Sequence, residues 1–337
     1  MFPVRLSTAR LALRPLEHGD AAPIAAALAD PEVARWLTGV PEPYALSDAE
    51  AFLGKVAGKP GYWAICGPDL MGVVSLRAGL GLGYWLAREH WGQGLVPEAA
   101  EAVLAHHFGR SDLPVRSGHH PGNDRSRNVL LALGFRDSGM VEVSTVKAVG
   151  RQWIQQMQLT EAAWKFALDP RVETARLVVS PFMPGDAAQV SAQLNDPEIA
   201  PMFGSVPHPF PPEIAEKWLG TNRWRGRVGF RWGIRLRSGE LIGGIGLGGN
   251  PVSTMYWIAR AHWRQGYATE AMAAFLPEMA ARLNLPEVIA RVFTDNPGSA
   301  ALLSHLGFVK TGEEVAQSKA RLEPAPVFTY RKSFTGG

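Results

Sequence analysis

The sequence predicts an α+β fold with mixed sheets, present as two tandem copies, and three observations lead to this prediction. The chain has 337 residues, which suits two domains of about 150 residues each better than one. A domain-sized internal repeat runs through it. Within each copy, strand-like segments with a period of two alternate with segments that carry helix start and stop signals. We therefore expect one domain over residues 1–168 and a second over 169–337.

The internal repeat preserves both the identity and the order of several short motifs. Thr-Ala-Arg-Leu occurs at 8–11 and again at 174–177, which is an offset of 166 residues. Later motifs recur in the same order: Asp-Pro-Glu at 30–32 and 196–198, Tyr-Trp at 84–85 and 256–257, Gln-Gly at 93–94 and 265–266, Glu-Ala at 98–99 and 270–271, and Gly-Phe at 134–135 and 307–308. Solenoid repeats have far shorter periods, so we expect two copies of one whole fold, joined near Asp169.

The elements of each copy follow in one order. Asp20 and Asp186 stand at the N-cap positions of helices expected to end at Leu28 and Leu194. A hairpin is expected next, over 62–65 and 70–76 in the first copy and over 230–236 and 241–247 in the second. A strand (82–86 or 255–258), a glycine-containing loop, a helix (97–108 or 269–283) and a further strand (115–119 or 288–293) come after it. The last helix begins with Asn-x-x-Ser and ends at a glycine, which is a common helix stop.

The loop between the strand and the long helix is the most informative segment for function. A glycine-containing loop at this place turns several backbone N–H groups toward one point, and the helix adds partial positive charge at its N-terminus. Both features favour an anion, phosphate in particular. The candidate residues are Gln93, Gly94, Leu95 and Val96 in the first copy, and Arg264, Gln265, Gly266, Tyr267, Ala268 and Thr269 in the second. The alternative is a tight turn that binds no ligand.

The ordered set of motifs resembles the GNAT superfamily of acetyl-CoA-dependent N-acetyltransferases, and most closely its RimJ/RimL branch, which acetylates protein N-termini. The motifs that carry this resemblance are Thr-x-Arg-Leu, Asp-Pro-Glu, Tyr-Trp, Trp-x-Gln-Gly-x-x-x-Glu-Ala, Asn-x-x-Ser and Leu-Gly-Phe, and they cover nearly the whole chain, once per half. The resemblance implies two tandem GNAT-like domains. Each would be a mixed twisted sheet of about six to seven strands with helices on both faces, and a splay between the fourth and fifth strands would admit the pantetheine arm of CoA.

The resemblance further implies that the two glycine loops hold the pyrophosphate of acetyl-CoA. Both loops depart from the family by beginning with Trp where Arg or Gln is common. We expect the second loop to bind better, because Arg264 adds positive charge and Ala268 is small. In the first loop, Val96 is bulkier and Pro97 lacks a backbone N–H group.

The Asn-x-x-Ser motif matches the family position near the CoA thiol. Asn123 and Ser126 form it in the first copy, and Asn296 and Ser299 in the second. The resemblance makes the two serines candidate general acids that protonate the departing thiolate, while helix capping by the same residues is the alternative. Trp257 and Ile258, on the second copy's fourth strand, are further candidates for cofactor binding, and the backbone of that strand is a candidate donor to the oxyanion.

A glutamate base of the RimL kind has no match in this sequence. Glu142, Glu313 and Glu314 lie a few residues too early on the late strand of each copy. The residues nearer to the family position are Ser144, Thr145, Lys147, Ser318 and Lys319. We interpret the three glutamates as solvated surface charge.

Arginines alternate with apolar residues between Phe230 and Arg237, and three more arginines precede them at 223, 225 and 227. This pattern is typical of an edge or solvent-facing strand that charge protects from further pairing. Binding of an acidic partner is the alternative.

Composition excludes several classes of protein. The single cysteine, Cys66, excludes an internal disulfide and every paired-cysteine zinc site, and the nine histidines contain no HExxH pattern, so we expect no metal. A net charge of +3 is too small to argue for a nucleic-acid partner by itself, and we expect none. No apolar stretch approaches the roughly 18 residues that a membrane span requires, and the start of the chain lacks a signal-peptide pattern. We expect a cytoplasmic protein.

The sequence therefore predicts an N-acetyltransferase that moves an acetyl group from acetyl-CoA to a primary amine. The acceptor is either a protein N-terminus or a small amine. The alternative is a catalytically degenerate tandem module that binds CoA and acts as a regulator or scaffold. We expect either a monomer that behaves as a pseudo-dimer or a homodimer.

Overall fold

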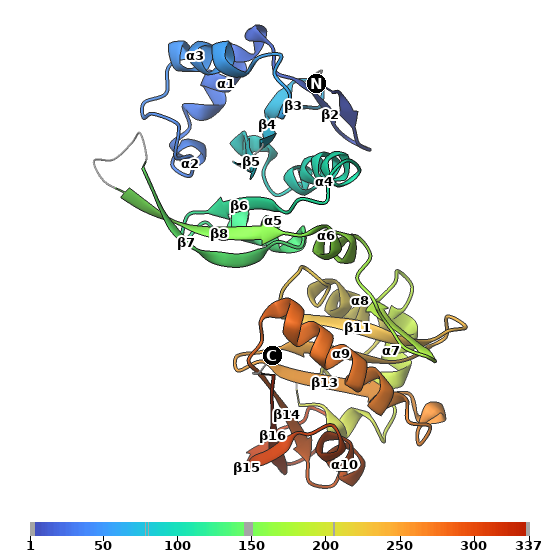
Figure 1. Ribbon diagram of the computed structural model, residues 1–337. Coiled ribbons are helices and arrows are strands. Elements are labelled where there is room, and N and C mark those ends of the chain that lie inside the picture. The colour runs from blue at the N-terminus through green and yellow to red at the C-terminus, as the bar shows by residue number, and fades with distance from the viewer. Residues whose placement is uncertain (1–3, 78, 80, 145–150, 205, 335–337) are drawn as a thin grey trace. The chain divides into compact units, whose positions relative to one another are not determined.

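A computed structural model describes residues 4–77, 79, 81–144, 151–204 and 206–334 (Figure 1). The chain divides into two compact units, residues 1–168 and 169–337, called unit 1 and unit 2 below. Each unit combines sheets with helices on both faces, as the sequence predicted.

Unit 1 contains two sheets. The first is an antiparallel sheet of β1 (Leu6–Ser7), β2 (Ala12–Pro15), β3 (Tyr62–Cys66), β4 (Leu70–Arg77) and β5 (Gly81–Leu86), in that order. The second has the order β6 (Val115–His119), β8 (Arg151–Leu159) and β7 (Arg136–Ser144). The sheet is therefore interrupted between β5 and β6, where the family resemblance implies a splay. Across this opening, the Ser117 hydroxyl donates to the carbonyl of Leu82 at 2.9 Å.

The helices of unit 1 cover both faces of the first sheet. They are α1 (Ala21–Leu28), α2 (Pro31–Ala34), α3 (Leu46–Val56), α4 (Leu95–Phe108), α5 (Asp124–Ala132) and α6 (Glu161–Leu168), with short 3₁₀ turns η1 (His18–Asp20) and η2 (Arg88–His90). Successive strand residues point to opposite faces. Ala64 and Val73 accordingly join a core with α1 and α3, whereas Ile65 and Val74 join a core with α4 and α5.

Unit 2 repeats this arrangement around one sheet. Its strand order is β15 (Val309–Ala316), β16 (Ala325–Ser333), β14 (Glu287–Phe293), β13 (Ser253–Ile258), β12 (Leu241–Gly248), β11 (Phe230–Leu236), β10 (Leu177–Pro181) and β9 (Val172–Glu173). Its helices are α7 (Ala187–Leu194), α8 (Pro212–Thr221), α9 (Tyr267–Leu283) and α10 (Pro297–His305), with η3 (Ala200–Met202) and η4 (Arg260–His262). The parallel pair β13–β14 is joined at the register pair Ser253 and Ile289, at one end of β13.

Two expectations differ from the structure. Eight strands are described in each unit rather than about six to seven, because two-residue strands extend a sheet in each copy: β1 at the edge of the first sheet of unit 1, and β9 at the edge of the single sheet of unit 2. The prediction of an edge or solvent-facing strand at 230–237 is wrong. β11 lies inside the sheet between β10 and β12, and Gly233 and Arg235 on its polar side are buried. Arg235 can be buried there because it forms an ion pair with Asp186.

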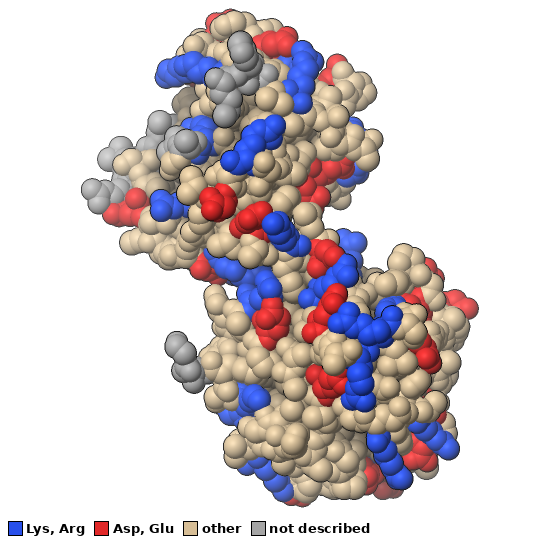
Figure 2. Space-filling view, turned by 45° about the vertical axis from the view of Figure 1, so that its right-hand side comes forward, with Lys and Arg blue, Asp and Glu red and all other residues tan. Residues whose placement is uncertain are grey.

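Acidic and basic side chains are interspersed on the face of the molecule shown in Figure 2 rather than gathered by sign. Within the described ranges, no helix combines the length and the apolar character needed to cross a membrane. The same residues contain no group of three His, Cys, Asp or Glu side chains that could hold a metal ion.

Candidate active site

The loop between β5 and α4 has the backbone that an anion site needs. Gly94 is the N-cap of α4 with φ 73°, and Gly92 has φ 76°, a left-handed conformation that glycine adopts without a Cβ penalty. Unit 2 keeps Gly266 at the N-cap of α9 with φ 79°. Its other left-handed position is occupied by Arg264, with φ 59°. The second loop therefore accepts some backbone strain and gains a cation in exchange.

Both helices begin two residues earlier than predicted, which fixes which amides face the loop. In α4 the amide of Glu98 bonds the carbonyl of Gly94, so the preceding amides have no helical acceptor. These are the amides of Leu95 and Val96, since Pro97 has no N–H group. In α9 the corresponding amides are those of Tyr267, Ala268 and Thr269. Each loop thus offers amides and a helix N-terminus to an anion, with one more donor in unit 2.

A buttress of three side chains, Thr8, Arg10 and Glu98, fixes the first loop from behind. The Glu98 carboxylate accepts hydrogen bonds from the Thr8 hydroxyl, from the Arg10 amide at 3.0 Å and from Arg10 Nε at 2.6 Å. Arg10 Nη1 also donates to the carbonyl of Gln93 at 2.9 Å. The buttress therefore ties the N-terminal segment, the loop and the first turn of α4 together.

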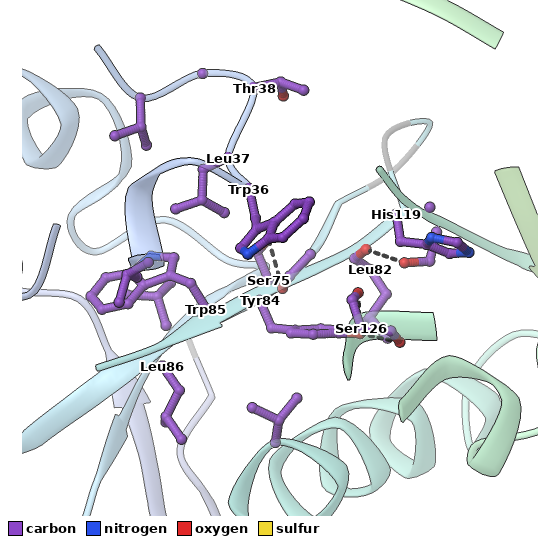
Figure 3. Close-up of a pocket in the computed structure, with 18 of the residues that line it drawn as sticks. Trp36, Leu37, Thr38, Ser75, Leu82, Tyr84, Trp85, Leu86, His119 and Ser126 are labelled. Carbon is purple, nitrogen blue, oxygen red and sulfur yellow. Dashed lines mark hydrogen bonds between the residues drawn. The ribbon is translucent and has the colours of Figure 1, made fainter. Parts of the chain in front are cut away.

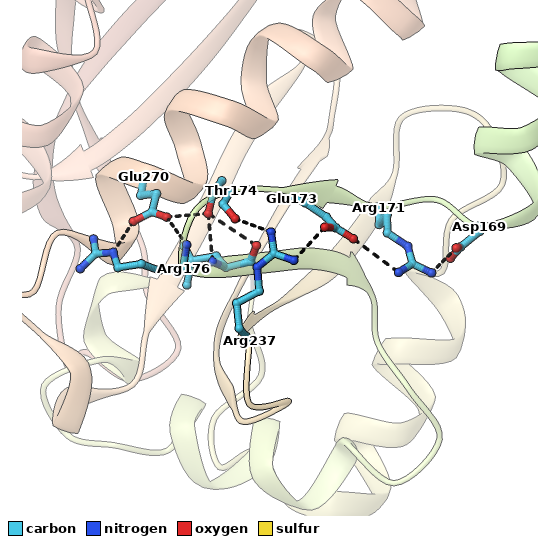
Figure 4. Close-up of polar contacts among 8 residues, drawn as sticks. Asp169, Arg171, Glu173, Thr174, Arg176, Arg237 and Glu270 are labelled. Carbon is cyan, nitrogen blue, oxygen red and sulfur yellow. Dashed lines mark hydrogen bonds and ion pairs between the residues drawn. The ribbon is translucent and has the colours of Figure 1, made fainter.

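Unit 2 contains the same buttress, formed by Thr174, Arg176 and Glu270 (Figure 4). Arg176 Nε lies 2.6 Å from Glu270 Oε2, and Arg176 Nη1 lies 3.0 Å from the carbonyl of Gln265. The repeated Thr-Ala-Arg-Leu and Glu-Ala motifs thus encode a loop support. The sequence contained the signal, since both motifs recur, but it did not reveal that they meet in space.

The tryptophan that begins each loop closes the end of the preceding strand. Trp91 Nε1 donates to the carbonyl of Leu86 at 2.8 Å, and Trp263 Nε1 donates to that of Ile258 at 2.6 Å. In unit 1 the guanidinium of Arg125, on α5, stacks 4.5 Å from the Trp91 ring centre. The first loop therefore has a neighbouring cation that sequence spacing did not indicate.

A cavity of about 1400 Å³ in unit 1 connects this loop with the opening between β5 and β6 (Figure 3). Among the predicted site residues, Gly94, Leu95, Val96, Asn123 and Ser126 line it. Gln93 does not, because its side chain bonds the carbonyl of Glu89 at 3.2 Å and its own carbonyl bonds Arg10. The cavity also has walls from the opposite face of the sheet, which include Val33, Phe52, Tyr62, Arg77 and Trp85. It can therefore be reached from both faces.

Ser126 points its hydroxyl into this cavity beside a tyrosine (Figure 3). Asn123 Oδ1 accepts from the Ser126 amide at 3.2 Å, so the asparagine makes the capping bond. The Ser126 hydroxyl lies 2.9 Å from the Tyr84 hydroxyl. Burial raises the pKa of Tyr84, and the bond to Ser126 offsets this only in part. Tyr84 therefore remains protonated at neutral pH and can donate to Ser126. Sequence reasoning treated Tyr84 only as a marker of the repeat.

The equivalent pair in unit 2 is looser. Asn296 Oδ1 accepts from the Ser299 amide at 3.0 Å, which repeats the cap. The Tyr256 hydroxyl is buried and has no hydrogen bond among the described residues, although Ser299 lies near enough to lower its pKa. Burial outweighs this and raises the pKa of Tyr256 to about 12. The hydroxyl pair is therefore hydrogen-bonded only in unit 1 of the described structure.

Trp257 and Ile258 turn their side chains into the core. Trp257 is 4% exposed, and its Nε1 donates to Gln193 Oε1 at 2.9 Å. Ile258 is 7% exposed. Only the backbone of β13 at these residues can meet a ligand.

The three carboxylates considered as bases, Glu142 in unit 1 and Glu313 and Glu314 in unit 2, are exposed. Glu314 pairs with Arg291 at 2.6 Å, which lowers its pKa, and Glu313 pairs with Lys310 at 3.5 Å. Glu142 lies between Val141 and Val143, which both line the cavity, so it points to the opposite side of β7. Ser318 is buried, and its hydroxyl donates to the carbonyl of Phe203. Thr145 and Lys147 are outside the described residues.

Two histidines at the end of β6 line the cavity instead. His119 Nδ1 lies 3.0 Å from the carbonyl of His120, and its Nε2 lies 3.4 Å from Arg127. With Nδ1 as the donor, Nε2 accepts from Arg127, so both nitrogens of His119 are engaged. His120 also lines the cavity, with its ring 6.3 Å from that of Trp36, and His90 of η2 is a third imidazole in the cavity wall.

Comparison with known proteins gives one family. The Acetyltransferase (GNAT) domain matches residues 10–136 and again 176–309. An uncharacterized N-acetyltransferase of Bacillus subtilis (strain 168), YoaA, is 32% identical over 151 residues, which are 42% of this chain and 85% of that protein.

Solved structures cover about half of this chain each. The ribosomal-protein-S5-alanine acetyltransferase of Vibrio fischeri is 19% identical, with a TM-score of 0.42 over 50% of this chain and 98% of that one. RimJ of Mycobacterium smegmatis, in complex with CoA-disulfide, is 21% identical, with a TM-score of 0.41 over 47% and 82%. Because the family pattern matches both halves and spans most of the sequence, the chain belongs to the GNAT family of acetyl-CoA-dependent acetyltransferases.

Proposed function

We propose that unit 1 transfers the acetyl group of acetyl-CoA to a primary amine inside the cavity described above. The observation that carries this proposal is that one cavity contains both the Gly94 loop and the Ser126 hydroxyl and is lined from both faces of the sheet. Two substrates can then meet at the opening between β5 and β6. CoA would enter from the side of α4 and the amine from the side of α1 and α3.

Different residues of unit 1 would bind the pyrophosphate, the pantetheine arm and the thioester of acetyl-CoA. The amides of Leu95 and Val96 and the guanidinium of Arg125 would bind the pyrophosphate. The pantetheine arm would pass between β5 and β6. Every second residue of β5 turns its backbone N–H away from β4 and toward this opening, so these amides are available to the oxyanion of the tetrahedral intermediate.

The proton transfers follow from the remaining groups. The neutral amine attacks the thioester carbonyl, the C–S bond breaks, and the thiolate takes a proton from Ser126, whose hydroxyl is oriented by Tyr84. We propose that His120 takes the proton lost by the amine, because of the three imidazoles that line the cavity it lies between β6 and the Ser126 helix, whereas His90 lies in η2 before the glycine loop and His119 is engaged by Arg127. The products are the N-acetyl amide and CoA, and proton exchange with water returns Ser126 to its hydroxyl and His120 to its neutral form. Positioning of the two substrates would contribute more than either proton transfer.

The acceptor stays open between a protein N-terminus and a small amine. Relatives support both, because one solved neighbour is a ribosomal-protein-S5-alanine acetyltransferase and another is a spermidine N-acetyltransferase from Vibrio cholerae in complex with CoA and spermine. Use of acetyl-CoA as the donor fits a cytoplasmic location.

Calorimetry with acetyl-CoA, followed by thiol release over a panel of amines, tests this function. The panel contains peptides with free Ala or Ser N-termini, spermidine and amino acids. We expect binding of acetyl-CoA and turnover with at least one amine class. Binding without turnover on every amine would reject the enzymatic proposal for unit 1 and favour a CoA-binding regulator.

A further inference from the structure

Arg77 is a cation in the cavity of unit 1 that the proposed chemistry does not use. It ends β4 and lines the cavity. Its Nη1 donates to the Tyr62 hydroxyl at 3.3 Å, and its Nε is buried without a hydrogen bond. Arg77 forms no ion pair within the described ranges, which contain every Asp and Glu of the sequence. The guanidinium also lies over the Tyr62 ring, 5.5 Å from its centre, but neither the ring nor the hydroxyl of Tyr62 carries the full negative charge that would best compensate a half-buried cation.

The position of Arg77 separates it from the pyrophosphate of CoA. Arg77 pairs with Gly81 at the start of β5, whereas the glycine loop follows the other end of β5, after Leu86. Six strand residues place these ends about 17 Å apart. Arg77 also shares the sheet face of Tyr62 and Ser75, which is the side of α1 and α3, whereas Tyr84 belongs to the opposite face with α4. Arg77 therefore lies on the side from which the amine would enter.

Unit 2 places a guanidinium at the same location from a different strand. By strand pairing, Arg231 stands where Tyr62 stands in unit 1, and Gly248 stands where Arg77 stands. A Cβ on Gly248 would lie 3.2 Å from Arg231 Nη1, so the guanidinium occupies the space above that glycine. Arg231 bonds backbone carbonyls and the Met255 sulfur, has no acidic partner among the described residues, and burial lowers its pKa to about 10.

A second pair of arginines has undergone the same exchange. Asp20 is held by Arg14 of β2, whereas its counterpart Asp186 is held by Arg235 of β11, at the position of Cys66. The cation moved to the neighbouring strand while its anionic partner stayed. By the same logic, Arg77 and Arg231 keep one cation at this location in both copies, and no Asp or Glu among the described residues pairs with either arginine.

We propose that the acceptor is a small primary amine that also carries a carboxylate, and that Arg77 binds this carboxylate at the amine side of the unit 1 cavity. This proposal rests on the proposed acetyl transfer and narrows its substrate class. A guanidinium binds a carboxylate through two parallel N–H···O bonds. The only acidic side chain that lines the cavity within the described residues is Asp48, whereas Lys55, Arg77, Arg116 and Arg125 line it too. A polycationic amine would meet an unfavourable field there.

The experiment compares amines that differ only in the carboxylate. Thiol release from acetyl-CoA by the full chain is measured with the free acids and the primary amides of glycine, β-alanine, 4-aminobutanoic acid and leucine, and with spermidine and an Ala-initiated peptide amide. We expect at least one free acid to exceed its amide in kcat/KM by about tenfold or more, chiefly through KM. The spacing of the best acid reports the reach from the reacting amine to Arg77.

Variants assign the preference to Arg77. Arg77→Gln should remove the acid-over-amide ratio while leaving the KM for acetyl-CoA unchanged, and Arg77→Lys should restore part of it. Arg110→Gln is the matched control, since Arg110 is exposed at the end of α4 and bonds only the carbonyl of His106 through its side chain. Differences in amine basicity cancel when each ratio is compared with wild type.

The outcomes distinguish the proposal that unit 1 transfers an acetyl group from the proposal that Arg77 binds a carboxylate of the acceptor. Turnover of amides, spermidine or the peptide as fast as of every free acid overturns the carboxylate proposal and leaves the acetyltransferase proposal standing. An acid preference that Arg77→Gln retains overturns the role of Arg77. No turnover with any amine rejects both. Should Arg77→Gln not fold, the comparison of acids with amides on the wild-type protein still decides.

Discussion

At the scale of single residues, the Ser126–Tyr84 pair is the sharpest test of the proposed chemistry. Ser126→Ala should lower kcat about tenfold to a hundredfold, because the thiolate would lose its positioned proton donor. The affinity for acetyl-CoA should stay within about twofold, since the Asn123 cap remains. Tyr84→Phe should have a smaller effect, because it removes only the orienting bond. Single-turnover kinetics and calorimetry measure the two quantities.

The control for this prediction is Ser111→Ala. Ser111 lies in the loop before β6, where its hydroxyl accepts from the Leu113 amide. A Ser126→Ala variant with unchanged kcat would show that water protonates the thiolate and would remove Ser126 from the mechanism.

His120 gives a second prediction at this scale, on pH dependence. A general base must be neutral, so at a fixed concentration of neutral amine the rate should show a rising limb in acid and then level off. His120→Asn should lower kcat/KM for the amine and abolish that rising limb, while His18→Asn, in the exposed η1 turn, should keep it. A pH–rate profile over pH 5 to 9 measures this. A limb that survives in His120→Asn would assign the proton transfer to another group or to water.

At the scale of elements, the buttress of Thr8, Arg10 and Glu98 predicts a coupled loss of stability and CoA affinity. Glu98→Gln keeps the shape but weakens charge-assisted bonds to Thr8 and Arg10, which should cost about 1–3 kcal/mol of unfolding free energy at pH 7. It should also weaken acetyl-CoA binding, because the loop would lose its support. Denaturant unfolding and calorimetry measure both, and Glu270→Gln is the equivalent change in unit 2.

The difference in unfolding free energy between wild type and Glu98→Gln should depend on pH, and its direction follows from the pKa of Glu98. The hydrogen bonds from Thr8 and Arg10 lower the pKa of Glu98 below its usual 4.5. A lowered pKa in the folded state stabilises the protein above pH 4.5, and this stabilisation is lost as the pH falls through the folded-state pKa. The difference in unfolding free energy between wild type and Glu98→Gln should therefore become smaller as the pH falls into the acid range. A gap that is the same at pH 3.5 and pH 7 would show that the charge of Glu98 contributes nothing.

Most elements could be predicted because their signals are local. The bounds of β6 at Val115–His119 and of α1 and α7 at Leu28 and Leu194 agree with the pattern of apolar residues and helix stops. The polarity of β11 was misinterpreted for a reason that is not local. An arginine at position 235 is expected to be exposed from the sequence alone. It is buried because its ion pair with Asp186, 49 residues earlier, offsets the cost of desolvating the guanidinium.

In the candidate site, too, contiguous motifs could be predicted from the sequence, whereas residues that act through contacts distant in the chain could not. The glycine loops and the Asn-x-x-Ser motifs are contiguous segments, and the sequence indicated them. Tyr84, Arg77 and Arg125 act through neighbours that are distant in the chain, so nothing in their own segments marked them. The repeat offers one remedy. Where one copy has Arg and the equivalent position of the other copy has Gly or Ser, as at Arg77 and Gly248, the arginine has been replaced by one on a neighbouring strand.

At the scale of the whole molecule, duplication has left two loops that offer different donors to CoA. Unit 1 has two loop amides and Arg125 from α5, whereas unit 2 has three loop amides and Arg264 within the loop itself. The Arg264 side chain is exposed and makes no hydrogen bond or ion pair with any described residue, so it is available to a phosphate. The hydrogen-bonded Tyr–Ser pair is found in unit 1. We therefore expect unit 2 to bind CoA more tightly and unit 1 to carry out the transfer.

Blocking one loop at a time separates these roles. Gly94→Trp and Gly266→Trp each place an indole against the arginine of the buttress, because an added Cβ would lie 3.7 Å from Arg10 Nη2 and 3.5 Å from Arg176 Nη2, so each should displace the loop that offers its amides to the phosphate. The left-handed backbone at both positions, with φ 73° and 79°, adds about 1–2 kcal/mol of strain, which a unit of this size can tolerate. Calorimetry of the wild type should show two sites for CoA per chain. Gly266→Trp should remove the tighter site and keep turnover, whereas Gly94→Trp should remove the weaker site and abolish turnover.

Matched controls separate blocked binding from backbone strain. Gly58→Trp in unit 1 and Gly239→Trp in unit 2 carry comparable strain, with φ 66° and 95° and nothing within 4 Å of an added Cβ. Both should retain the two sites and full turnover, and circular dichroism should show all four variants folded. If Gly266→Trp abolished turnover while Gly94→Trp did not, the catalytic role would belong to unit 2. Its Tyr256 and Ser299 would then have to form, on CoA binding, the hydrogen bond that Tyr84 and Ser126 already make, because the same geometry would be needed to protonate the thiolate there.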